Sequence, residues 1–138
     1  MNTLNNCVEQ ESFLPQKDRE YLAEKGFKYR EVIEGKVKCL IIEEYSLPEG
    51  KYNVETVNLL VKIPNGYNDT PPDMFFCYPH LKFSNTNVDP PATGGRFSFD
   101  EKSWQQWSRH SNVGNDWRPG IDGISSHLQK VNAALKKG

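Results

Sequence analysis

A serine and a histidine lie two positions apart in a polar stretch of the chain, at Ser108 and His110. A serine hydroxyl is a weak nucleophile and needs a neighbouring general base before it can accept an acyl group. An imidazole titrates near neutral pH, which suits that role. Residues two apart in an extended segment point to the same face, so this spacing predicts that the two side chains approach each other. The alternatives are a solvated loop serine and a histidine that caps a loop.

The cysteines give no sign of a disulfide or a metal site. Cys7, Cys39 and Cys77 are an odd number with wide, irregular spacing, whereas disulfide frameworks and zinc sites need paired spacings. Cys77 and His80 are spaced like half a metal site, but the sequence has no second half, so we expect a core cysteine and a loop histidine. Cys39 is also expected in the core. We predict no metal, no cofactor and a reduced, cytoplasmic protein.

The bulk composition predicts one globular domain. Of the 138 residues, 36% are hydrophobic and 25% are charged, and the formal net charge is −1. No basic block is present to bind phosphates, so we exclude nucleic acid as the main partner and expect a protein instead. The apolar runs are strand-sized and the N-terminus lacks the features of a secretory signal, so we predict no membrane association. We place a flexible tail at residues 1–12 and a single domain at residues 13–138.

The elements that must position these residues follow an α+β order. Residues 14–25 have helical spacing and are followed by Gly26, a helix stop. Three alternating apolar segments and a fourth, short and largely apolar one lie between residues 27 and 78, and their short connections predict a four-stranded antiparallel meander. Residues 79–102 have no convincing period, and so long an irregular stretch is usually functional or mobile.

The last segment has the spacing of an amphipathic helix, with Pro119 in its first turn. His127 lies off the apolar face, which predicts a solvated position. The three tryptophans that precede or open this segment are expected to pack around a loop. The apolar face consists of Ile121, Ile124, Leu128, Val131 and Leu135, and the tryptophans are Trp104, Trp107 and Trp117.

Local motifs sharpen this order of elements. The third predicted strand ends in Ile63-Pro64-Asn65-Gly66-Tyr67, and Pro71-Pro72-Asp73-Met74-Phe75 leads into the fourth. Trp107-Ser108-Arg109-His110 precedes Trp117-Arg118-Pro119-Gly120-Ile121, which opens the last helix. In their order and spacing, over about residues 14–136, these motifs resemble the ubiquitin-conjugating (E2) superfamily. The chain is most similar to the bacterial E2-like group called prokaryotic E2 family E.

This resemblance implies a UBC-like fold with an N-terminal helix, a four-stranded antiparallel meander, a long active-site loop and a C-terminal helix. It also implies an activity, because an E2 accepts the C-terminal acyl group of a ubiquitin-like protein and passes it to an amine. The implied partners are an E1-like adenylating enzyme, a ubiquitin-like protein and a deconjugating peptidase of the same pathway.

The chain departs from the family at the nucleophile. Family members carry the nucleophilic cysteine shortly before the tryptophan of the Trp-x-Pro motif, but no cysteine follows Cys77 here. The only side chain in that window that can form an ester is Ser108, so the resemblance implies an oxyester on Ser108 with His110 as its base. Arg109, Asn112 and backbone N–H groups of residues 108–116 are candidate donors to the oxyanion.

The His-Pro-Asn motif of the family is also missing, and Tyr78-Pro79-His80-Leu81, its nearest equivalent, lies too early in the chain. This favours an alternative function, that of a catalytically inactive E2 variant that binds a ubiquitin-like protein. A third reading, a purely structural domain of the same fold, leaves the segment between Trp107 and Trp117 unexplained.

Overall fold

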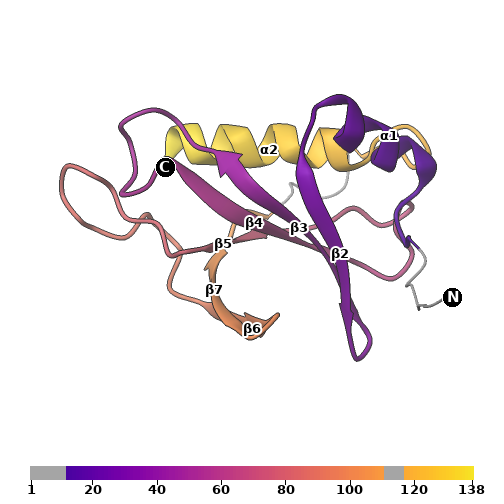
Figure 1. Cartoon of the computed structure of the whole chain (residues 1–138), viewed down its shortest axis with the longest axis horizontal. Coiled ribbons are helices and arrows are strands. Elements are labelled where there is room, and N and C mark those ends of the chain that lie inside the picture. The colour runs from indigo at the N-terminus through magenta and orange to yellow at the C-terminus, as the bar shows by residue number, and fades with distance from the viewer. Residues whose placement is uncertain (1–11, 111–116) are drawn as a thin grey trace, which may run out of the picture.

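The computed structural model describes residues 12–110 and 117–138, which form two helices and an antiparallel sheet (Figure 1). The α+β class predicted from the sequence is confirmed. Residues 1–11, most of the predicted tail, lie outside the described part. The elements follow in the order α1 (Gln16–Glu24), β2 (Lys28–Glu34), β3 (Val37–Ser46), β4 (Thr56–Ile63), β5 (Phe75–Tyr78), β6 (Arg96–Phe99), β7 (Lys102–Trp107) and α2 (Ile124–Lys137).

The sheet has six strands, in the order β2-β3-β4-β5-β7-β6, with every neighbouring pair antiparallel. The four strands expected between residues 27 and 78 correspond to β2, β3, β4 and β5, and the sheet is larger than predicted because two further strands join it. The two additional strands, β6 and β7, form a hairpin whose first strand lies inside the stretch expected to have no period. Strand β6 has only four residues, too few for an alternating pattern to stand out in the sequence.

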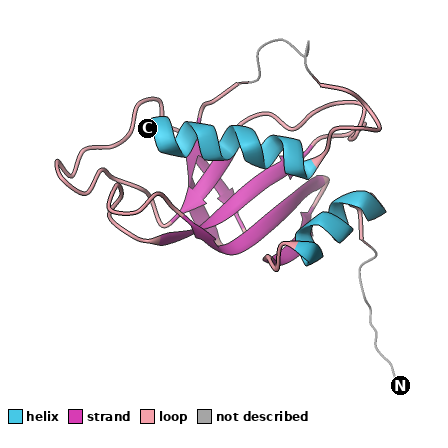
Figure 2. Ribbon diagram, turned by 90° about the horizontal axis from the view of Figure 1, so that it is seen from above, coloured by secondary structure: helices cyan, strands magenta, loops and turns pink. Residues whose placement is uncertain are grey.

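Helix α2 lies across one face of the sheet, and α1 packs beside it at one end (Figure 2). The α2 side chains of Leu128, Val131 and Leu135 are at most 2% exposed and belong to the main core. The sheet contributes side chains from β3, β4, β5 and β7 to that core, including the fully buried Trp107. Burial of this apolar face is the main force that holds α2 in place.

In the described part of the chain, the opposite face of the sheet is covered by the β6–β7 hairpin and not by a helix. The β6–β7 hairpin curls under the sheet (Figure 1). Its fully buried Trp104 packs in a second core. Because both faces are covered, all four residues from Cys39 to Ile42 on β3 have no solvent exposure. This second core consists of Cys39, Ile41, Leu60, Phe76, Phe99 and Trp104.

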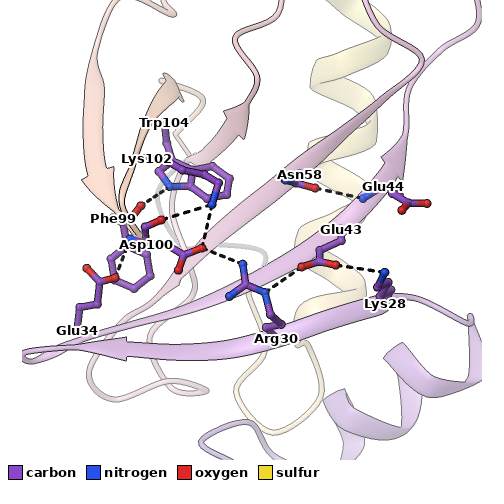
Figure 3. Close-up of polar contacts among 10 residues, drawn as sticks. All are labelled: Lys28, Arg30, Glu34, Glu43, Glu44, Asn58, Phe99, Asp100, Lys102 and Trp104. Carbon is purple, nitrogen blue, oxygen red and sulfur yellow. Dashed lines mark hydrogen bonds and ion pairs between the residues drawn. The ribbon is translucent and has the colours of Figure 1, made fainter.

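Polar contacts join the turn of this hairpin to the edge strand β2 (Figure 3). The Asp100 carboxylate lies 2.8 Å from the Arg30 guanidinium, and the Asp100 N–H donates to the Glu34 carboxylate at 2.7 Å. Inside the hairpin, the Trp104 indole N–H donates to the Phe99 carbonyl at 2.8 Å. These contacts connect the hairpin at one edge of the sheet to β2 at the other edge. They hold the turn from which β7 runs toward Ser108.

The segment before α2 differs from the prediction. Pro119 does not lie in the first turn of the helix, which begins at Ile124. The N–H groups of Ile121 and Asp122 both donate to the Arg118 carbonyl, and Gly120 has a φ of 82°. A helix cannot pass through a residue with that dihedral, so this segment forms a turn instead. Ile121 is accordingly 56% exposed rather than part of the apolar face.

Two of the motifs that carried the family resemblance meet in space. The Trp117 indole N–H donates to the Asn68 carbonyl at 2.8 Å, and the Trp117 and Tyr67 rings lie 6.4 Å apart. The Asn68 side chain also accepts the N–H of Gly120 and donates to the Asp122 carbonyl. The loop between β4 and β5 therefore fixes the approach of the chain to α2.

Candidate active site

Ser108 is the first residue after β7, and the chain turns at this position. The Arg109 N–H donates to the Trp107 carbonyl at 2.9 Å, which closes a three-residue γ-turn with Ser108 at its centre. The Ser108 N–H donates to the Ala92 carbonyl at 3.1 Å. Because Trp107 is fully buried, the turn is anchored in the core while Ser108 itself remains partly exposed.

The Ser108 hydroxyl has a hydrogen-bond partner that the sequence analysis did not identify. The side-chain amide of Gln106 donates from Nε2 to Ser108 Oγ at 3.0 Å. Gln106 lies in β7, two residues before Ser108, so the two side chains project to the same side of the chain. The signal that could have found this contact is the same spacing of two that pointed to His110.

His110 is oriented by a residue distant in the sequence. Its ring nitrogen Nδ1 lies 2.9 Å from Asp73 Oδ2, and the two side chains are 64% and 54% exposed. A carboxylate accepts a hydrogen bond, so Nδ1 carries the proton in this contact, and Nε2 of the neutral ring is then the basic nitrogen. No sequence pattern links positions 73 and 110, and the contact exists only because β5 and β7 are neighbours in the sheet.

The structure does not join Ser108 and His110 directly. Within residues 12–110 and 117–138, the Ser108 hydroxyl bonds to Gln106 and the His110 ring bonds to Asp73. The predicted approach assumed an extended segment through both residues, but the γ-turn at Ser108 changes the direction of the chain between them.

Arg109 lies against the core side of the turn. Its guanidinium carbon is 4.8 Å from the centre of the Trp107 ring, a cation–π contact. Beside it is an open groove of about 340 Å³ between the loop that follows β5 and the end of α2. The groove is lined by Pro91, Arg109, Ala133, Ala134, Lys137 and Gly138. Asn112, the other predicted donor, lies outside the described residues.

Both described cysteines are inaccessible. Cys39 and Cys77 have 0% exposure, which confirms the prediction that they belong to the core. Burial raises the pKa of the Cys39 thiol to about 12 and also raises the pKa of the Cys77 thiol. A thiol reacts as its thiolate, so neither cysteine can accept an acyl group in the folded protein. Cys7 lies outside the described residues.

The prediction of a solvated His127 is wrong. This residue is 4% exposed, and its ring lies 3.1 Å through Nε2 from the Met74 carbonyl. Burial lowers the pKa of its imidazole to about 4. Position 127 is next to Leu128 and one turn from both Ile124 and Val131, so the helical spacing itself carried the signal.

The described residues contain no group of three or more His, Cys, Asp or Glu side chains that could hold a metal ion. In the same part of the chain, no helix is long and apolar enough to cross a membrane.

Comparison with known proteins identifies the family. Searches among curated proteins and among solved structures find no significant match. The model of prokaryotic E2 family E matches residues 14–138, which include both helices, all six strands and the turn at Ser108. At the level of the family, this match supports a role in the conjugation of ubiquitin-like proteins, with an E1-like enzyme and a ubiquitin-like protein as partners. The chain belongs to prokaryotic E2 family E.

Proposed function

We propose that this protein is a cytoplasmic E2-type acyltransferase that receives a ubiquitin-like protein from an E1-like enzyme as an oxyester on Ser108. It then transfers the acyl group to an acceptor, and a deconjugating peptidase of the same pathway reverses the modification. One observation carries the proposal. The two described thiols are fully buried, whereas Ser108 is a partly exposed residue at a turn, nine residues before Trp117, where the resemblance expects the nucleophile.

The charging step needs a nucleophile, a base and an activated acyl group. Ser108 Oγ attacks the carbonyl carbon of the ubiquitin-like protein's C-terminus, which the E1-like partner supplies in activated form. A bond forms between Oγ and that carbon, and the bond to the leaving group breaks. The proton of the hydroxyl goes to His110 Nε2 and then to the leaving group.

The contact with Asp73 supports His110 as the base, because it keeps the proton on Nδ1 and leaves Nε2 as the acceptor. The exposed His110 ring must approach Ser108 when the acylated partner binds. Catalytic hydrogen bonds in a free enzyme are often long and shorten only in the complex with substrate. Arg109 and Asn112 stay candidate donors to the oxyanion.

The second candidate function is a binding module that presents a ubiquitin-like protein without being acylated. Within the described residues, no hydrogen bond joins Ser108 to His110, and this observation favours the module. The missing cysteine and the missing His-Pro-Asn motif favour it as well.

An intact-mass measurement separates the two functions. The protein is mixed with the E1-like enzyme, the ubiquitin-like protein and ATP, and the products are treated with thiol reductant or hydroxylamine. The proposal predicts an adduct that resists reductant and is cleaved by hydroxylamine. Ser108→Ala should abolish the adduct and His110→Gln should slow its formation about 100-fold or more.

Ser103→Ala is the matched control, because Ser103 is an exposed serine of the same strand, β7. Its adduct should form at the wild-type rate. An adduct that persists in Ser108→Ala would exclude Ser108 as the acceptor, and the absence of any adduct would favour the binding module.

A further inference from the structure

The Gln106 amide is the hydrogen-bond donor that the described structure places on the proposed nucleophile. Its Nε2 atom lies 3.0 Å from Ser108 Oγ, and its side chain is half-buried at the end of β7. The backbone of Gln106 is held as well, because its N–H donates to the Gly95 carbonyl at 3.0 Å. Residue 106 also pairs with Phe76 of β5. The backbone that carries the donor is therefore held in the sheet.

The two backbone N–H groups at the centre and end of the turn are already engaged. The Ser108 N–H donates to Ala92 and the Arg109 N–H donates to Trp107, so neither backbone group is directed at an oxygen of a bound acyl group. The Arg109 guanidinium lies against the Trp107 ring. Within the described residues, the hydrogen bond that reaches Ser108 Oγ comes from the Gln106 amide.

An oxyester on serine creates a chemical need that a thioester does not have. When the acyl group leaves for an acceptor, the bond that breaks is the one between the acyl carbon and the enzyme's oxygen or sulfur. A thiolate is stable near neutral pH and leaves readily, but an alkoxide is a far stronger base. A donor placed on the departing oxygen stabilises its developing negative charge.

We propose that Gln106 is a catalytic residue of the transfer step, and that its amide stabilises Ser108 Oγ as the leaving group. This role rests on the proposed function. The nitrogen of an acceptor amine attacks the acyl carbon and forms an N–C bond, while the C–Oγ bond breaks and its electron pair goes to Oγ. His110 Nε2 takes up the proton that the amine loses and passes it to Oγ. The amide of Gln106 donates a hydrogen bond throughout and exchanges no proton.

The absence of a side chain at Gly95 leaves room for the Gln106 amide. A Cβ atom added at Gly95 would lie 3.0 Å from Cδ and 3.1 Å from Nε2 of Gln106. Any side chain at position 95 would therefore displace the carboxamide. Two of the atoms that it would meet belong to the flexible end of the side chain, and the third, Gln106 Cβ at 3.2 Å, is held by β7. Gly95→Ala should therefore displace the carboxamide by a few tenths of an ångström.

The test measures discharge of the preformed oxyester to free lysine. Wild type, Gln106→Met and Gly95→Ala are charged with the E1-like enzyme, the ubiquitin-like protein and ATP, then freed of ATP and mixed with lysine. Methionine has about the length of glutamine but no amide donor. We expect discharge of Gln106→Met to be about 100-fold slower than that of wild type, with a smaller loss for Gly95→Ala. Gln129→Met, at an exposed glutamine of α2, should match wild type.

The same substitutions in a Ser108→Cys background separate this role from a structural one. A thiolate leaves without help, so Gln106→Met should slow discharge of the thioester less than about 10-fold. If Gln106→Met cannot be charged in the serine protein but is charged normally in the cysteine protein, the result supports the same role, because the donor then assists Oγ in both directions. Equal losses in both backgrounds, or wild-type discharge by Gln106→Met, would overturn the role of Gln106. Failure of the wild-type protein to form any oxyester would remove the proposed function itself, and this role with it.

Discussion

Asp18, in the first helix, caps the last one. Its Oδ1 atom accepts the N–H of Ile124 at 3.0 Å, where α2 begins. The residue before Ile124 is Gly123, which has no side chain to cap the helix, and a Cβ atom there would lie 2.4 Å from Asp18 Oδ1. The other carboxylate oxygen of Asp18 accepts the Tyr67 hydroxyl at 2.7 Å. One carboxylate thus joins α1, the loop between β4 and β5 and the start of α2.

Removal of this carboxylate should destabilise the whole domain. Asp18 is 4% exposed, so Asp18→Ala leaves a helix N–H and a tyrosine hydroxyl without their partner in a buried site. We expect the free energy of unfolding to fall by about 2 kcal/mol, as measured by urea denaturation. Glu24→Ala, at an exposed acidic residue of the same helix, should change it by less than about 0.5 kcal/mol. Equal effects of the two substitutions would show that Asp18 is not a cap.

The β6–β7 hairpin should be held by burial and not by its ion pairs. Trp104 is fully buried, and Trp104→Ala should lower the free energy of unfolding by about 3 kcal/mol or more. Arg30 contacts Glu43 and Asp100 but is 42% exposed, so Arg30→Ala should cost less than about 1 kcal/mol. Urea denaturation followed by circular dichroism measures both values. A larger loss for Arg30→Ala than for Trp104→Ala would mean that the polar contacts in Figure 3 dominate.

The buried His127 predicts a loss of stability in acid. Burial lowers the pKa of its imidazole to about 4, and the charges of Lys130 and Asp73 act on it in opposite directions with smaller effect. The unfolded chain binds a proton at this histidine near pH 6.5, while the folded chain does not until about pH 4. The folded state therefore loses roughly 3 kcal/mol as the pH falls through that window.

His127→Gln removes the titration but keeps a donor for the Met74 carbonyl. Urea denaturation at several pH values should give a shallower decline between about pH 6.5 and pH 4 for this variant than for wild type. Carboxylates contribute equally to both curves, so the difference between the curves isolates the histidine. Parallel curves would contradict the account of His127.

Side-chain spacing predicted the parts of the fold that rest on local pattern. The helical spacing around Leu22 and the alternation in β3 and β4 identified elements that the structure contains. The pattern was insufficient where a segment is short, as in β6, or where a glycine changes the direction of the chain, as at Gly120. In β3 it could not indicate that both faces are buried, because that depends on a hairpin formed more than fifty residues later.

In the candidate site, too, local sequence pattern predicted some features and could not predict others. Ser108 was found through its distance from Trp117, and the pairing of His110 with Asp73 depends on the neighbouring strands β5 and β7. Gln106 was within reach of the sequence analysis, because a strand residue two positions before Ser108 shares its side. The same argument failed for His110 because the chain turns at Ser108.

Localisation of the acyl group by peptide sequencing in the mass spectrometer tests the central claim most directly. The charged protein is digested without thiol reductant, and the residue that carries the C-terminal remnant of the ubiquitin-like protein is identified. The proposed function predicts the remnant on the oxygen of Ser108, in a linkage that hydroxylamine removes. A remnant on Cys7, Ser103 or Ser111, or on a lysine, would contradict it.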